Sequence, residues 1–280
     1  MDFKKFALLI SYFLLPVPLI VAFYYETLPE YRTGASIGLS AIGIIAYVWF
    51  CFEFVLMARP KLLDRTFGMD KITKFHIRNS IFMVILSILH ARLLRVRDLS
   101  YNATIKLGSS ALTFYMPFIL LGFIFMLNTK LDDMKIYFKI KGFFINKLRM
   151  RYHFSKFVHN LTMVATVFLY GHIMRTSSTQ NSLVLQILYS VYFFAGFLIW
   201  INHKFIWPIR IKKFKYEIID VVQETRDIWT LVLKPIGTHR ITFKAGQYCY
   251  LTLDAPGFSK EPHPFSFSSG SHTKEQIKRL

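Results

Sequence analysis

The sequence predicts an integral membrane protein: a membrane all-α six-helix bundle followed by a C-terminal partial antiparallel β-barrel. The first observation is composition, because 54% of the residues are hydrophobic, above the roughly 45–50% usual in soluble domains. The second is segmentation, because six apolar stretches long enough to cross a bilayer alternate with basic connections. The third is a change after residue 203 to short alternating segments separated by turn residues, which is typical of antiparallel strands.

The basic residues between the predicted spans indicate their orientation. The denser groups of Lys and Arg follow the second and fourth spans, which places these connections and both termini in the cytoplasm by the positive-inside rule. We therefore expect a multi-pass protein of the plasma membrane, surrounded by the lipid bilayer. The predicted spans are residues 6–25, 34–57, 72–93, 109–128, 154–174 and 182–201.

The net charge of +19 would also suit a protein that binds nucleic acid. However, the Lys and Arg residues lie between apolar spans, where they act as topology signals and as contacts for anionic lipids. We expect no nucleic-acid partner. The two cysteines, Cys51 and Cys249, lie in an apolar span and a strand-like run, which argues against a disulfide framework or a thiolate metal site.

The first span begins with basic residues, as a signal peptide does. No small-residue cleavage site follows, and the apolar run is near 20 residues, so we interpret it as an uncleaved membrane span. Pro16 and Pro18 should kink this span, because proline removes a helix hydrogen bond and crowds the preceding turn.

The third and fifth spans each carry one histidine near either end. These are His76 and His90 in the third span, and His159 and His172 in the fifth. Because both spans run outward, His76 and His159 should lie near the cytoplasmic side, and His90 and His172 near the outer side. Ionisable side chains inside a span are costly and are functional candidates by default. The separations correspond to about 20 Å along a helix, enough for two sites in one bilayer.

The two histidines of the third span lie close to one helical face, but those of the fifth span do not. On an ideal helix, His90 returns to within about 40° of the face of His76, whereas His172 lies about 140° from His159. The fifth span must therefore be distorted, or it must approach its ligands obliquely. We expect the helix hydrogen bonds to be interrupted at Gly171, next to His172.

Four roles are considered for these histidines: a structural hydrogen bond, ligation of haem iron, a metal-ion site and a proton relay. A single buried histidine is often a hydrogen-bonded contact between helices, but four at matched depths favour paired imidazole ligands of two haem irons. A site for a metal ion is a weaker alternative, because no Asp, Glu or Cys accompanies the histidines and the two levels are too far apart to share an ion. A non-redox transporter, with histidines that relay protons, is a third alternative.

The C-terminal part is expected to form a soluble domain that starts near Pro208. Residues 215–223, 227–235 and 242–254 are short, β-branched and aromatic, and they read as antiparallel strands. Two motifs follow each other there, FKAGQYCYL at residues 243–251 and HPFSFSS at residues 263–269. A short hydroxyl and an aromatic face in such a run suit a planar heteroaromatic ring.

The pattern His-x13-His in a third span and His-x12-His in a fifth resembles the membrane core of the NADPH oxidase and ferric reductase family. The resemblance covers residues 1–203 and continues through residues 204–280. It implies two haem b groups, with His76 and His159 binding the inner haem iron and His90 and His172 the outer one. It also implies transfer of electrons from cytoplasmic NAD(P)H and FAD to an acceptor outside.

The two C-terminal motifs are similar to the G-Q-Y turn and the H-P-F-[ST] run with which this family binds FAD in a ferredoxin-reductase-like barrel. The resemblance implies that the Ser266 hydroxyl approaches flavin N5 and that Phe265 flanks the isoalloxazine ring. His263 and Pro264 would shape the bend of the chain. The family continues into a nucleotide-binding α/β domain with a glycine-rich turn. The sequence stops at Leu280, so we expect a missing C-terminal NAD(P)H domain or a partner reductase to oxidise NAD(P)H.

Two arginines follow the outer histidine of the third span on the side where the positive-inside rule does not require charge. Arg92 and Arg95 are therefore candidates for binding haem propionates or for acting at the outer haem edge, although long basic side chains also anchor helices at the interface. The favoured acceptor is O2, which would give superoxide. Reduction of ferric or cupric chelates is the alternative within the same architecture.

Overall fold

A computed structural model describes residues 3–96, 103–126, 135–147, 152–244, 246–258, 262–269 and 278–279. Within these ranges the chain is mostly helical, and small antiparallel sheets lie in its C-terminal part. The chain divides into two compact units, a helical unit Met1–Asn202 and a C-terminal unit His203–Leu280.

Six helical segments of the described chain are long and apolar enough to cross a membrane, which confirms the predicted number of spans. The chain is therefore a multi-pass membrane protein. The largest shifts from prediction are in the fourth span, which begins at Thr104 instead of residue 109, and in the sixth, which continues to Ile211. The segments are Phe3–Glu26, Gly34–Met57, Met69–Leu94, Thr104–Gly122, Phe154–Met174 and Leu183–Ile211.

The first span consists of two helices, α1 (Phe3–Leu14) and α2 (Val17–Glu26). The break lies at Leu15 and Pro16, where the missing proline N–H interrupts the ladder of helix hydrogen bonds. Pro18 lies in the first turn of α2, where a helix tolerates proline because that N–H would have no partner inside the helix. The predicted kink is confirmed.

The helix α3 (Gly34–Met57) forms the centre of the helical unit, and its second half is almost continuously buried. The helix α11 (Leu183–Ile201) packs on it at very close range. At Gly196 of α11, an added Cβ would lie 2.4 Å from the backbone oxygen of Cys51, so only glycine fits there without a shift of the backbone. This contact makes α3 a fixed support for the helices that carry the histidines.

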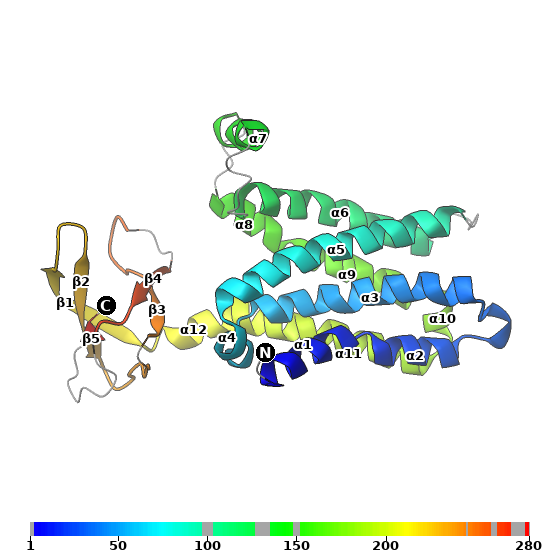
Figure 1. The fold of residues 1–280 in the computed structure, drawn as a ribbon, viewed down its shortest axis with the longest axis horizontal. Coiled ribbons are helices and arrows are strands. Elements are labelled where there is room, and N and C mark those ends of the chain that lie inside the picture. The colour runs from blue at the N-terminus through cyan, green and yellow to red at the C-terminus, as the bar shows by residue number, and fades with distance from the viewer. Residues whose placement is uncertain are drawn as a thin grey trace. The chain divides into compact units, whose positions relative to one another are not determined.

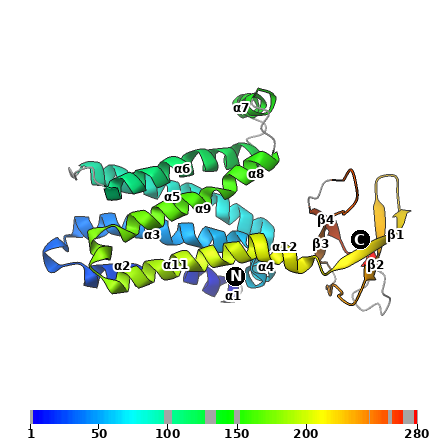
Figure 2. The ribbon, with the colours of Figure 1, turned by 180° about the vertical axis from the view of Figure 1, so that it is seen from behind.

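The histidines lie on helices that pack on different neighbours. The helix α5 (Met69–Val96) packs along α3, whereas α8 (Tyr152–Asn160) and α9 (Thr162–Met174) pack along α6 (Ala103–Met126). Figures 1 and 2 show these groups from opposite sides. Within the described chain, the backbone of α5 comes close to the backbone of α8 or α9 at almost no position. The two histidine-bearing spans therefore meet through side chains.

The fifth span is broken at Leu161, two residues after His159 of α8. The N–H of Leu161 donates to the oxygen of Val158 (3.0 Å), and the N–H of Val164 donates to the oxygen of Leu161 (2.9 Å). These three-residue spacings are tighter than those of an α-helix and change the helical phase. The predicted distortion is therefore confirmed, but its predicted position was wrong. Gly171 lies inside the continuous helix α9.

Shorter helices connect the spans. The helix α7 was not predicted, because its sequence mixes Lys with Ile and Phe and has no long apolar run. It lies in the connection after the fourth span, and its Ile136 and Phe138 are about 70% exposed. The connecting elements are η1 (Pro29–Tyr31), α4 (Lys61–Phe67), α7 (Lys135–Asn146), α10 (Ser177–Gln180), a π-helical turn (Asn202–Ile206) and α12 (Trp207–Ile211).

The C-terminal unit contains the predicted antiparallel strands. In one sheet, β1 (Lys215–Gln223) pairs with β2 (Trp229–Ile236), which also pairs with β5 (Lys278–Arg279). In a second sheet, β3 (Tyr248–Leu251) pairs with β4 (His263–Ser266). The described strands form two separate sheets and not a closed barrel, so the barrel remains a prediction.

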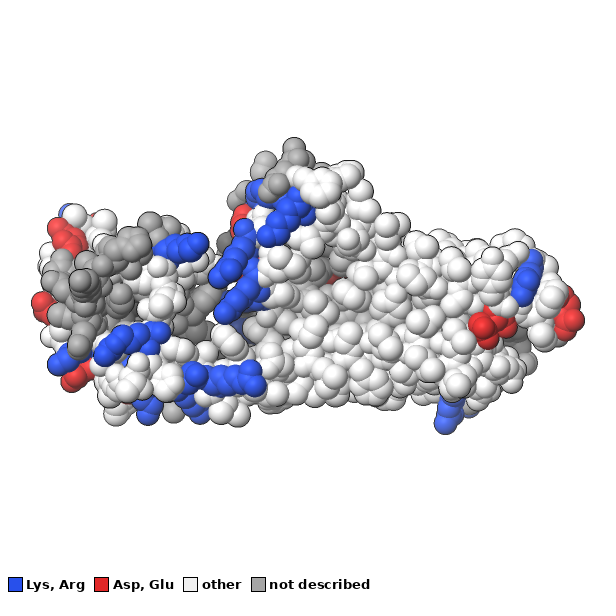
Figure 3. Space-filling model, turned by 90° about the horizontal axis from the view of Figure 1, so that it is seen from below, with Lys and Arg blue, Asp and Glu red and all other residues white. Residues whose placement is uncertain are grey.

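Charged side chains are sparse along the middle of the helical unit. On the face shown in Figure 3, Lys and Arg gather toward the ends of this unit, and the surface between them is almost entirely uncharged. Large apolar side chains of the spans are more than half exposed, among them Ile85, Leu120 and Val191. Such a surface suits contact with lipid chains, in agreement with the six spans.

Candidate functional site

The inner pair of predicted ligands lies together. His76 on α5 and His159 on α8 approach each other with ring centroids 6.2 Å apart and ring planes at 83°. An imidazole nitrogen binds a transition metal at about 2 Å, and the ring centre lies about 1 Å behind it, so two imidazoles on opposite sides of one metal have centroids about 6 Å apart. The observed separation therefore suits a metal between the two rings.

The outer pair occupies the opposite ends of the same two spans. His90 lies toward the end of α5 and His172 toward the end of α9, and each ring lies against a glycine of a neighbouring helix. The break at Leu161 changes the helical phase between His159 and His172 from that of a continuous helix. The structure brings the rings of His76 and His159 together, and the pairing of His90 with His172 remains a prediction.

All four histidines share one hydrogen-bonding arrangement. In each ring Nδ1 lies at an oxygen acceptor, which places the hydrogen on Nδ1 and leaves Nε2 with a free lone pair. Metal-bound histidines show this arrangement, because the acceptor fixes the tautomer and the orientation of the ring. The acceptors are a Glu53 carboxylate oxygen for His76, and the backbone oxygens of Leu39 for His90 (2.9 Å), Phe118 for His159 (3.4 Å) and Thr104 for His172 (2.7 Å).

Three of the imidazoles lie against glycines of neighbouring helices. A Cβ at Gly43 of α3 would lie 2.8 Å from the ring of His90. On α6, a Cβ at Gly108 would lie 3.0 Å from the ring of His172, and one at Gly122 would lie 3.0 Å from that of His159. Any larger residue would displace these rings. Sequence reasoning missed the three glycines, because the contact between a glycine and a ring on another helix leaves no pattern along the chain.

The space between the two histidine levels is filled by packed side chains. Met83 of α5 is fully buried, and Phe50 of α3 stacks on Tyr115 of α6 with ring centroids 4.5 Å apart. The Tyr115 hydroxyl shares a short hydrogen bond with the Thr166 hydroxyl of α9. The two levels are therefore separate sites on a common scaffold.

A carboxylate accompanies the inner pair, contrary to the expectation that no acidic residue does. Glu53 of α3 is 6% exposed and contacts Nδ1 of His76. It lies one span earlier in the chain than His76, and only the packing of α3 on α5 brings the two together. The sequence did hold a signal, since Glu53 is the only Asp or Glu within the six predicted spans.

The donor set favours two paired imidazole sites over a site for a bare metal ion. Among the described residues, no group of three or more His, Cys, Asp or Glu side chains could hold an ion. A haem iron needs only two axial ligands from the protein, because the macrocycle supplies the others. The free Nε2 atoms, the acceptors at Nδ1 and the glycine contacts therefore fit haem.

A hollow on α6 does not belong to the histidine sites. On a helix, its lining residues lie on the side opposite Thr104 and Gly108, which contact His172. Its volume is about 370 Å³, and it is lined by Lys106, Ser109, Ser110, Thr113 and Phe114.

The two arginine candidates differ in what the structure describes. Arg92 lies on α5, two residues after His90, and its side chain is exposed. Arg95 belongs to the same helix, but its side chain lies outside the described part of the chain. Among the described residues no acceptor is seen for the Arg92 guanidinium, so its role remains a prediction.

The two C-terminal motifs lie side by side. The strands β3 and β4 pair so that Cys249 is opposite Phe265 and Tyr248 is opposite Ser266. The turn before β3 contains Gly246 with φ +78°, a conformation that favours glycine. Burial raises the pKa of the Cys249 thiol, so this thiol stays protonated at neutral pH.

The side chains of β4 that could contact a flavin are accessible. Ser266, His263 and Pro264 are exposed, and Phe265 is half-buried. Just beyond the strand, Phe267 stacks on Phe243 with ring centroids 3.9 Å apart, which joins the ends of the two motifs. The structure brings the motifs together, and their contact with FAD remains a prediction.

No protein-family model and no curated protein matches this chain.

Proposed function

We propose that this chain carries electrons across a membrane through two haem b groups, one held by His76 and His159 and the other by His90 and His172. The shared arrangement of the four imidazoles is the observation that supports this proposal, because each leaves Nε2 free while Nδ1 is held by an acceptor. When bound, haem supplies a one-electron carrier at each level.

The protein's own residues orient and enclose these sites. The backbone oxygens and Glu53 hold the planes of the imidazoles, and the glycines of α3 and α6 give them room. The packed layer between the levels, with Met83 and Tyr115, keeps water out of the path. If two histidines hold each haem iron, neither iron would have a position open for the acceptor, which would then be reduced without binding to the iron.

The electrons would come from a flavin on the cytoplasmic side. The pairing of β3 with β4 supports this part of the proposal, since it joins the two motifs that resemble an FAD site. Ser266 and Phe265 would contact the flavin, and His263 and Pro264 would shape the chain around it. NAD(P)H would be oxidised by a further C-terminal domain or by a partner reductase. The orientation follows the basic connections, with both termini in the cytoplasm.

The favoured acceptor is O2, with superoxide as the product, and ferric or cupric chelates are the alternative. The exposed side chain of Arg92, two residues after His90, is the observation that supports the alternative, because a positive charge there would attract an anionic chelate. The two activities share the same histidine sites and differ only in what reaches the outer level.

A reduced-minus-oxidised spectrum of the purified chain tests the proposal. We expect Soret and α bands at b-type positions from haem retained through purification in detergent. A spectrum without these bands would contradict the electron-transfer function and would favour the proton-relay transporter.

The acceptor can be identified by reducing the purified protein with dithionite, removing the excess, and mixing it with air-saturated buffer or with a ferric chelate. Superoxide formation is expected to appear as cytochrome c reduction that superoxide dismutase suppresses. Release of iron(II) without superoxide would assign the metalloreductase activity. Failure of both acceptors to reoxidise the haem would contradict both activities.

A further inference from the structure

The four histidines are not equivalent, because only one has a charged acceptor. Backbone oxygens hold Nδ1 of His90, His159 and His172, whereas a carboxylate oxygen of Glu53 holds Nδ1 of His76. A carboxylate is a stronger acceptor than a peptide carbonyl and makes the imidazole a stronger electron donor to a metal. The inner level therefore differs chemically from the outer level.

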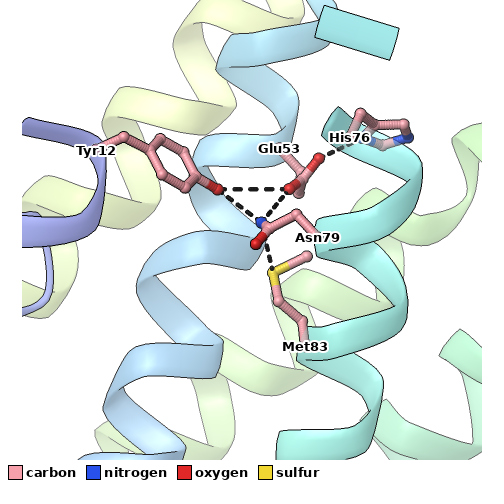
Figure 4. A network of polar contacts seen from close by, with 5 residues as sticks. All are labelled: Tyr12, Glu53, His76, Asn79 and Met83. Carbon is pink, nitrogen blue, oxygen red and sulfur yellow. Dashed lines mark hydrogen bonds and ion pairs between the residues drawn. The ribbon is translucent and has the colours of Figure 1, made fainter. Parts of the chain in front are cut away.

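The carboxylate of Glu53 is held by a network of side chains that can all donate hydrogen bonds. Its Oε1 accepts from the amide of Asn79 (2.5 Å) and, more weakly, from the hydroxyl of Tyr12 (3.5 Å). Its Oε2 contacts Nδ1 of His76, and the Asn79 amide also donates to the Tyr12 hydroxyl (2.7 Å). Figure 4 shows Tyr12 of α1 and two side chains of α5, His76 and Asn79, converging on Glu53 of α3. Donors on both oxygens suit the ionised carboxylate, which only accepts.

The network is built into the core of the helical unit. Glu53 and Asn79 are 6% and 7% exposed, and the ring of Tyr12 stacks on Trp49 with centroids 5.9 Å apart. A buried carboxylate at this depth is costly unless a positive group compensates it. Among the partners of Glu53 in the described chain, only His76 can be positively charged or can bind a positively charged metal through Nε2. The network is thus oriented toward the proposed inner iron.

We propose that Glu53 is a positioning residue that makes His76 a stronger axial ligand and holds the reduction potential of the inner haem below that of the outer haem. This inference rests on the proposed function. The negative charge close to the inner site stabilises the oxidised iron, and the strengthened imidazole acts in the same direction. Electrons that enter at the inner level then move energetically downhill to the outer level. Glu53 would thereby give the transfer its outward direction.

A redox titration of the purified full chain, followed by the b-type absorbance, tests this inference. The wild type is expected to show two one-electron waves, and the wave that His90→Ala retains identifies the inner site. Glu53→Gln should raise the potential of that wave alone. The expected rise is about 59 mV or more, which for one electron corresponds to at least a tenfold change in how the electron distributes between the two haems. The haem content should remain at the wild-type level.

Glu26→Gln is the matched control, because Glu26 accepts a hydrogen bond from Ser182 at the end of another span and does not contact a histidine. It should leave both waves unchanged. A second variant, Asn79→Leu, keeps the carboxylate but removes its closest amide donor. It should lower the reduction potential of the inner haem, because less of the negative charge of Glu53 is compensated. This shift is opposite in sign to that of Glu53→Gln, and general damage to the site would not produce opposite shifts in the two variants.

Two outcomes overturn different statements. Unchanged waves in Glu53→Gln and Asn79→Leu, or equal shifts in Glu26→Gln, would overturn the role of Glu53 and leave the proposed function standing. A wild type without b-type absorbance would overturn the proposed function and this inference together.

Discussion

At the scale of single residues, the account depends on how each imidazole is held. The four histidines could be predicted from the sequence, because ionisable side chains stand out in apolar spans. Their acceptors could not, since three are backbone oxygens of other helices and the fourth is a side chain of α3. Glu53 was detectable in principle as the only acidic residue of the predicted spans, but its partner depends on the packing of α3 against α5.

Gly43→Ala tests the close contact between α3 and the outer site. The added Cβ would lie 2.8 Å from the ring of His90, so the ring must move away from its acceptor at Leu39. We expect the outer haem to be lost or its potential to change, while the inner haem remains. The absorbance spectrum and the haem content of the purified variant measure this.

Gly38→Ala on the same helix is the control, because a Cβ there meets nothing within 4 Å. It should retain both haems. Equal haem loss in the two variants, or full retention in Gly43→Ala, would show that the glycine contact does not support the site.

At the scale of elements, the positions of the spans were predictable, but the local irregularity of the fifth span was only half predictable. The 140° mismatch between His159 and His172 required a distortion, and the break at Leu161 supplies it. Glycine was a poor guide to its position, because Gly171 is held within α9. In the first span proline was a good guide, since Pro16 cannot donate the hydrogen bond that a continuous helix needs.

Insertion of one alanine after Val167, inside α9, tests whether helical phase controls the outer site. The insertion rotates His172 by about 100° relative to α8, so the outer pair should lose its haem while His159 keeps the inner one. Haem content and the redox waves should show one site.

The same insertion after Asn181, in the turn before α11, is the control and should leave both haems in place. Two normal sites after the insertion in α9 would contradict the assignment of His172 as an axial ligand.

At the scale of the whole molecule, the sequence predicted a membrane helical part followed by strands, and both are present in the described chain. Whether the strands belong to a closed barrel depends on pairings beyond those described. The orientation in the membrane rests on charge alone, because the helices would pack in the same way in either direction.

Labelling with a membrane-impermeant maleimide tests that orientation. A cysteine introduced at exposed Ser177, in the connection after α9, should be labelled from outside intact cells. A cysteine at exposed Lys61, in the connection after α3, should be labelled only after permeabilisation. The reverse pattern would place the termini on the outer side and reverse the proposed direction of transfer.

The central claim is that four histidines hold two haems as two separate pairs. The haem-to-protein ratio of the purified chain tests it most directly. We predict two haems per wild-type chain, one haem in His90→Ala and one haem in His76→Ala, with b-type absorbance in each. A wild type that retains no haem, or single variants that retain both haems, would contradict the account.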